Sequence, residues 1–208
     1  MIRTDNDANA HGDDPIIPTC TKELSCGHQC FGVEDERKCL PCLDPACAPK
    51  HFKGGITADE LCHICYTSEL GVEACSKLSC GHVFHTNCLV NLLRAKWPKL
   101  RITWDFMSCP ECRQEISPRG LSKPIVAELG QLLSLKAKVE ELALKNAERQ
   151  GILNDAAVAE KDGKFYGKNQ EYANKKCSVF LCNECKKPYF GGLRDCEQDM
   201  ANEEQNNT

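Results

Sequence analysis

The fold is decided by residues 62–112, CHICYTSELGVEACSKLSCGHVFHTNCLVNLLRAKWPKLRITWDFMSCPEC. Eight cysteines and histidines in this stretch form four close pairs. The pairs are Cys62 and Cys65, Cys80 and His82, His85 and Cys88, and Cys109 and Cys112. Tetrahedral zinc takes four such ligands, and two residues at this spacing can chelate one ion from a tight turn. The stretch therefore predicts two zinc ions, and the alternative is that these are buried thiols of an ordinary core.

The order of the ligand types resembles that of a RING finger with two central histidines. A PHD finger would carry Cys where this chain has His82, and usually Trp where it has Met107; a LIM domain would not place two histidines side by side in ligand order. The resemblance implies interleaved ligation. One ion would be held by Cys62, Cys65, His85 and Cys88, and the other by Cys80, His82, Cys109 and Cys112.

Composition agrees with a set of small metal-bound modules. Seventeen of 208 residues are Cys, mostly in close clusters, which favours metal sites in a reducing compartment over disulfides. The N-terminal MIRTDNDANAHGDD has no apolar signal-peptide core, and no stretch has the apolar length of a membrane span. A net charge of −4 argues against nucleic acid as a partner. With only 6% aromatic residues, we expect small zinc-stabilised α+β modules rather than one large core, in an intracellular, cytoplasmic protein, with the nucleus also open.

A second Cys/His cluster precedes the RING-like stretch. Residues 1–18 are expected to be a disordered leader, and residues 19–53 a zinc module. Its eight candidate ligands are Cys20, Cys26, His28, Cys30, Cys39, Cys42, Cys47 and His51. They suffice for two ions, but the spacing leaves their pairing open, and a merely cysteine-rich linker is the alternative.

Within the RING-like module, residues 58–118, a helix is expected over Leu89–Lys96, ended by Pro98. Ile64, Trp97 and Pro110 stand where RING fingers build their groove for a ubiquitin-conjugating enzyme, and Arg113 where ordinary RING ligases often carry a basic linchpin. A few exposed apolar anchors on a rigid frame can carry most of the energy of such binding. The alternative for Ile64 and Trp97 is that they pack on the module's own core.

The rest of the chain predicts a long helix and a further metal turn. An amphipathic helix begins at Ser122 within a 119–162 linker, which we expect to be a connector packed on its neighbours rather than a dimerising coiled coil. Residues 163–196 predict a strand, a zinc knuckle and a returning strand, with Cys182, Cys185 and Cys196 as candidate ligands and the fourth left open. Residues 197–208 are expected to be an acidic disordered tail.

The order of these modules closely resembles the C-terminal region of the Pam/Highwire ubiquitin ligases, which are neuronal enzymes of the RING-Cys-relay type. The resemblance rests on Cys39-Leu40-Pro41-Cys42-Leu43, on Arg101-Ile102-Thr103 and on the KFYG…CNECKKPYFGG segment that begins at Lys164. It implies a ligase that takes ubiquitin onto its own cysteines and esterifies Thr or Ser hydroxyls. The stretch that would carry the relay lies past residue 208, so no relay cysteine, and no catalytic residue, is assigned.

Together these patterns predict a RING-type ubiquitin ligase module that needs zinc. It would recruit a ubiquitin-charged conjugating enzyme and promote transfer to a protein substrate by orienting the thioester, without a covalent step and without membrane insertion. His63 is expected to be an exposed side chain, and Cys75 a spare buried thiol. The competing hypothesis is a non-enzymatic, zinc-stabilised protein-interaction module.

Overall fold

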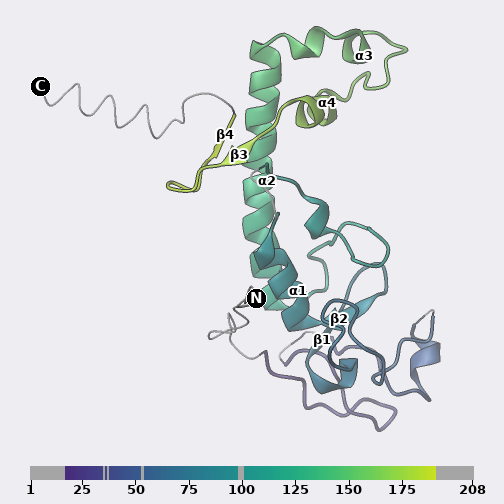
Figure 1. Ribbon diagram of the computed structural model, residues 1–208. Coiled ribbons are helices and arrows are strands. Elements are labelled where there is room, and N and C mark those ends of the chain that lie inside the picture. Colours follow the sequence, from purple (N-terminus) through teal and green to yellow (C-terminus); the bar gives the residue numbers. More distant parts are fainter. Residues whose placement is uncertain (1–16, 35, 37, 53, 98–100, 191–208) are drawn as a thin grey trace, which may run out of the picture. The chain divides into compact units, whose positions relative to one another are not determined.

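The computed structural model describes residues 17–190, apart from 35, 37, 53 and 98–100 (Figure 1). The chain divides into two compact units. The first comprises Met1–Leu89 and Gly120–Ser122, and the second Val90–Arg119 and Lys123–Thr208. The elements are short apart from one long helix, which confirms the prediction of small α+β modules. Among the described residues, no helix combines the length and the apolar character needed to cross a membrane.

The first unit contains a short antiparallel hairpin. Strand β1, Cys75–Lys77, pairs with β2, Val83–His85, so that Cys75 lies opposite His85. Gly81 turns the chain between the strands at a φ of +99°, a conformation that glycine adopts without steric cost. All three residues of β2 are buried, and helix α1, Thr86–Ala95, follows directly. The end of β2 is therefore paired with β1 and continues directly into α1.

The N-terminal Cys/His segment belongs to the same unit, and backbone hydrogen bonds join it to the hairpin and to the chain just before Cys62. The Cys75 N–H donates to Phe31 O at 2.7 Å, and the Ala58 N–H donates to Leu43 O at 2.8 Å. The segment ends in a 3₁₀-helix, Ala48–Lys50, and a second one spans Leu70–Val72. The buried apolar residues of the unit include Leu40, Leu43, Phe52, Leu70, Leu78, Phe84 and Leu89. Such a small core supplies only a limited part of the free energy that folding requires.

Helix α1 begins three residues earlier than predicted. It ends at Ala95, and Lys96 follows at a φ of +56°, the left-handed conformation common just past a helix end. The helix therefore stops before Pro98, which lies outside the described residues. Leu89 and Leu93 are fully buried.

The second unit is organised by helix α2, Lys123–Arg149 (Figure 1). Its other elements are α3, Ala156–Ala159; α4, Asn169–Lys176; β3, Phe180–Leu181; β4, Pro188–Tyr189; and 3₁₀-helices at Asp105–Met107 and Ile152–Asn154. β3 and β4 are antiparallel, so the predicted strand, turn and returning strand are confirmed. Ile102 is hydrogen-bonded to the residue just before β3, because its N–H donates to Val179 O at 3.0 Å.

Helix α2 is continuous across Gly130. This glycine is exposed, so its cost of about 1 kcal/mol relative to Ala is small against the burial of the opposite face. That face buries Ile125, Leu129, Leu132, Val139, Ala143, Asn146 and Ala147. The helix ends where Gly151 adopts a φ of +67° and donates its N–H to Glu148 O.

Small residues let α4 approach α2 closely. Ala143 and Ala147 of α2 form a buried cluster with Ala173 of α4, and the Gln170 side chain donates to the Glu140 carbonyl at 2.8 Å. Helix α2 therefore packs on its neighbours within the chain.

Candidate metal centres

Three Cys-x2-Cys turns share one backbone geometry. In each, the residue after the second cysteine has a positive φ: 55° at Tyr66, 63° at Arg113 and 57° at Lys186. The N–H of that residue donates to the carbonyl of the first cysteine, at 2.8, 2.9 and 3.1 Å respectively. The turn directs both thiols of a pair to one side, which is the geometry that a tetrahedral ion requires.

A second local motif, LSCGH, occurs twice, at residues 24–28 and 78–82. In both copies the Leu N–H donates to the His carbonyl, at 2.8 and 2.9 Å, and the Gly N–H donates back to the Leu carbonyl, at 2.8 and 2.9 Å. Gly27 and Gly81 both have a positive φ, 83° and 99°. The two copies therefore present a cysteine and a histidine from the same kind of turn, one copy in the N-terminal module and one in the RING-like module. This repeat was available in the sequence as a signal and was missed.

The structure brings together Cys62, Cys65, His85 and Cys88, as the RING resemblance implied. Their ligand atoms all lie within 4.8 Å of one another. His85 Nδ1 lies 3.7 Å from Cys65 Sγ and 3.8 Å from Cys88 Sγ. Zinc bonds of about 2.0–2.3 Å in a tetrahedron separate ligand atoms by roughly 3.5–3.8 Å, so these residues fit a zinc ion.

His85 is also oriented for coordination. Its Nε2 donates to the Glu69 carbonyl at 2.9 Å, which turns the Nδ1 edge of the ring toward the thiols. The cysteines of the group differ in pKa. A hydrogen bond from the Cys88 thiol to Cys62 lowers the pKa of Cys62 to about 3 and raises the pKa of Cys88. Burial opposes ionisation of Cys65, but hydrogen bonds from Thr67 and Ser68 outweigh it and lower its pKa to about 6. Metal binding would release the remaining thiol protons.

The ligands predicted for the second RING ion are presented as two pairs, one in each unit. In the first unit, Cys80 Sγ lies 3.3 Å from His82 Nδ1 in the second LSCGH turn. In the second unit, Cys109 and Cys112 stand on a knuckle, with Cys109 buried and Cys112 exposed. The Cys109 N–H donates to Gln114 O at 2.8 Å, which closes the knuckle.

In the N-terminal module, Cys26, His28, Cys42 and Cys47 form a compact group. His28 Nδ1 lies 3.6 Å from Cys42 Sγ and 3.5 Å from Cys47 Sγ, again the separation that a shared zinc ion gives. A backbone hydrogen bond and the side chain of His28 lower the pKa of Cys26 to about 7, whereas burial raises the pKa of Cys42 to about 11.

Asp44 supports this group and was not predicted. Its Oδ2 lies 3.5 Å from His28 Nε2, while its other oxygen accepts the Ala46 N–H at 2.9 Å. Its carbonyl also accepts the Cys47 N–H at 2.9 Å. A carboxylate behind a metal-binding histidine fixes the ring and its tautomer, so Asp44 suits the role of an orienting residue.

The remaining cysteines of the N-terminal module form a third group, Cys20, Cys30 and Cys39. Cys39 and Cys42, although separated by only two residues, thus belong to different groups. The residue that follows them, Leu43, is buried and lacks the positive φ of the three knuckles. His51, predicted as a ligand, is exposed at the end of the Ala48–Lys50 helix and belongs to none of the groups found among the described residues.

The predicted groove residues occupy defined local positions. Ile64 is half-buried within the Cys62–Cys65 knuckle, and next to this knuckle the exposed Tyr66 ring stacks on His63 at 5.6 Å between centroids. In the second unit, Trp97 is half-buried, with its ring 6.0 Å from that of Trp104 in an edge-on contact.

The other two predicted contact residues lie on the Cys109–Cys112 knuckle. Pro110 is half-buried and Arg113 is exposed. Whether these residues contact a partner stays a prediction.

The remaining cysteines differ in accessibility. Cys75 is fully buried, as expected, and its thiol donates to Leu70 O at 3.1 Å. Burial raises the pKa of both Cys75 and Cys177. On the β3–β4 turn Cys182 is buried and Cys185 exposed, while Cys196 lies outside the described residues. None of the 16 described cysteines is in a disulfide.

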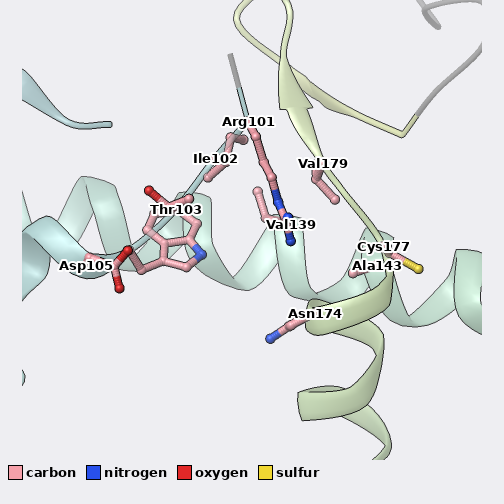
Figure 2. A pocket seen from close by; sticks show the side chains of 10 residues that line it. Arg101, Ile102, Thr103, Asp105, Val139, Ala143, Asn174, Cys177 and Val179 are labelled. Carbon is pink, nitrogen blue, oxygen red and sulfur yellow. The ribbon is translucent and has the colours of Figure 1, made fainter. Parts of the chain in front are cut away.

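A pocket of about 290 Å³ lies in the second unit, and none of the residues that line it belongs to these ligand groups (Figure 2). Arg101 extends into it between Val139 and Val179, and Asn174 of α4 lies below (Figure 2). The Arg101 guanidinium has no hydrogen-bond or ion-pair partner within the described part of the chain. Cys177 lines the pocket, but a buried thiol with a raised pKa is a poor nucleophile.

The fold and these groups define a small α+β protein whose Cys/His clusters can hold metal ions. Thiolate and imidazole donors in tetrahedral arrangement suit zinc. No protein-family model matches the chain.

Two relatives are similar over most of its length. E3 ubiquitin-protein ligase MYCBP2 of Danio rerio is 34% identical over 182 residues, 88% of this chain. E3 ubiquitin-protein ligase highwire of Drosophila melanogaster is 31% identical over 204 residues, 93% of this chain. The chain belongs to the Pam/Highwire family. It spans about 4% of the length of each of these relatives.

Proposed function

We propose that this chain is a zinc-dependent, RING-type ubiquitin ligase module that recruits a ubiquitin-charged conjugating enzyme and promotes transfer of ubiquitin to a protein substrate. The observation that carries the proposal is the group Cys62, Cys65, His85 and Cys88, which has the ligand order of a RING finger and the spacing of a tetrahedral zinc site. The names of the two relatives, both E3 ubiquitin-protein ligases, support the reaction class.

Two zinc ions would hold the RING-like module. The first would bind the group just named, and the second Cys80, His82, Cys109 and Cys112. The shared knuckle geometry at Cys62 and Cys109 supports equivalent roles for the two turns. Zinc would take no part in the transfer step itself. When bound, it would hold the loops that carry its ligands in place.

The conjugating enzyme would be recruited by apolar side chains on this frame. Ile64 lies within one knuckle and Pro110 within another, and both remain partly exposed. Trp97 is held by ring contacts with Trp104 and Phe106, at 6.0 and 6.2 Å, so it could offer its remaining surface at a low entropic cost.

Transfer would be accelerated by orientation. Arg113 follows the last predicted ligand, and its backbone is fixed at a φ of 63° by the hydrogen bond to Cys109 O. An exposed guanidinium at such a fixed position can donate to both ubiquitin and the conjugating enzyme and hold the thioester ready for attack. The attacking nucleophile would come from the substrate, since Cys75 and Cys177 are both buried.

The relay to Thr or Ser hydroxyls is proposed for full-length members of the family only. No described cysteine is assigned to it. We place the protein in the cytoplasm, with the nucleus also open, because its cysteines gather in metal-type groups.

The proposal is tested by ubiquitin discharge. A charged conjugating enzyme is incubated with the zinc-loaded chain and with free lysine or threonine as acceptor, and loss of the thioester is followed on a non-reducing gel. We expect faster loss than without the chain. An unchanged rate across a panel of conjugating enzymes would favour a non-enzymatic interaction module.

A further inference from the structure

The group Cys20, Cys30 and Cys39 is an incomplete tetrahedral site. Cys20 and Cys30 are buried, at 3% and 0% exposure, and all three sulfurs lie within 4.8 Å of one another. Among the described residues no fourth Cys, His, Asp or Glu atom falls inside this same limit. Three thiolates brought so close repel one another unless a cation binds, and zinc in a structural site takes four ligands.

Gly32 contacts two members of this group through its backbone. Its N–H donates to Cys30 Sγ at 3.3 Å, and its carbonyl accepts the Cys20 N–H at 2.8 Å. Its φ is not positive, so the backbone alone does not require glycine here. A larger residue would be crowded here: a Cβ at this position would lie 3.1 Å from Glu36 Oε2, 3.1 Å from Leu40 Cβ and 3.3 Å from Cys30 Sγ.

The Glu36 carboxylate and the Cys30 thiol therefore close over the same face of Gly32. Glu36 is half-buried, whereas Glu34, two residues earlier, is exposed. Within the described part of the chain no cationic side chain pairs with Glu36. A backbone hydrogen bond from Val33 offsets part of the cost of removing this carboxylate from water, and a metal ion held by the neighbouring thiolates would offset more of it.

We propose that Glu36 is the fourth zinc ligand of Cys20, Cys30 and Cys39. Zinc accepts carboxylate oxygen at about 2.0–2.2 Å, and rotation of this long side chain would bring it into reach. The N-terminal module then holds two ions. One site has three thiolates and a carboxylate, and the other has the three thiolates and one imidazole of Cys26, His28, Cys42 and Cys47.

The ligands of the two sites are interleaved along the chain. The loop that one ion closes therefore contains ligands of the other ion. His51 has no role in either site. The proposal rests on metal binding by this module and does not depend on ligase activity.

The test counts and types the metal sites of the full chain. Glu36→Gln is compared with two controls, Glu34→Gln on an exposed neighbour and His51→Gln on the histidine that spacing alone would favour. We expect Glu36→Gln to weaken one zinc by at least about tenfold in a chelator competition read by native mass spectrometry, with both controls unchanged. Loss of an ion from His51→Gln and not from Glu36→Gln would overturn the assignment.

A second variant covers the case in which Glu36→Gln perturbs folding. Glu36→Cys replaces the carboxylate with a fourth thiolate. In the cobalt-substituted chain it should strengthen the thiolate-to-cobalt charge-transfer absorption by one thiolate, relative to the unchanged chain at equal cobalt content. If Glu36→Cys adds no such absorption, Glu36 does not face the metal and the proposal fails.

Discussion

Replacing a single zinc ligand should unfold the RING-like module, whereas removing a nearby thiol of equal burial should not. Cys62 and Cys75 are both cysteines with no exposed surface in the same unit. Cys62 belongs to a metal group, and Cys75 donates to the Leu70 carbonyl instead. Cys62→Ala and Cys75→Ala therefore remove the same atom from two equally buried positions, and only one of them is a predicted ligand.

The expected magnitudes differ widely. A structural zinc ion contributes roughly 10–16 kcal/mol of apparent binding free energy in small zinc domains, which is comparable to the whole stability of a domain, about 5–15 kcal/mol. The elements around this group are short, with strands β1 and β2 of three residues each, and offer little to replace it. Cys75→Ala loses one buried thiol and one weak hydrogen bond, so we expect about 1–2 kcal/mol.

The assay is an amide NMR spectrum recorded together with the zinc count by native mass spectrometry. Cys62→Ala should lose dispersion for residues 60–115 and at least one ion, while Cys75→Ala should retain both. If Cys62→Ala keeps its native dispersion and full zinc content, or if Cys75→Ala loses them equally, the ligand assignment is wrong.

Three further results are expected. Arg113→Ala should slow ubiquitin discharge about tenfold, equivalent to about 1.4 kcal/mol of barrier, without loss of zinc, whereas Arg119→Ala, also an exposed arginine, should have no effect; equal slowing by both would argue for a general charge effect. No reductant-sensitive ubiquitin adduct should form on this chain, because burial keeps Cys177 protonated, and an adduct abolished by Cys177→Ser would contradict this. Asp44→Asn should weaken the zinc bound by His28 by roughly tenfold or more, measured by chelator competition, and unchanged affinity would remove Asp44 from its orienting role.

The sequence predicted the parts of the fold that depend on local pattern. The resemblance to RING fingers implied the group around His85, and apolar periodicity identified α2, although Gly130 argued against the continuity of that helix. For the helix, neighbours along the chain determine which face is buried, so the spacing of apolar residues carries the information.

Sequence reasoning failed where the outcome depends on a turn or a cavity. The two cysteines of a Cys-x2-Cys pair fall into one group where the next residue adopts a positive φ, as Tyr66 does after Cys65. Leu43, the residue after Cys42, does not adopt a positive φ, and Cys39 and Cys42 fall into different groups. The spacing of the cysteines does not reveal this difference. The proximity of Glu36 to Cys30 depends on the space that Gly32 leaves open, which ligand spacing does not encode.

The most direct test of the ligase proposal is the discharge rate of the zinc-loaded Ile64→Ala chain. Val72→Ala serves as the control, because Val72 is an apolar residue of the same unit that is 66% exposed and outside the metal groups. We predict that Ile64→Ala retains its amide dispersion and zinc but loses most of the stimulation of ubiquitin discharge, while Val72→Ala discharges at the unchanged rate. Full stimulation by Ile64→Ala, or unfolding of that variant, would contradict the assignment of Ile64 as an anchor for the conjugating enzyme.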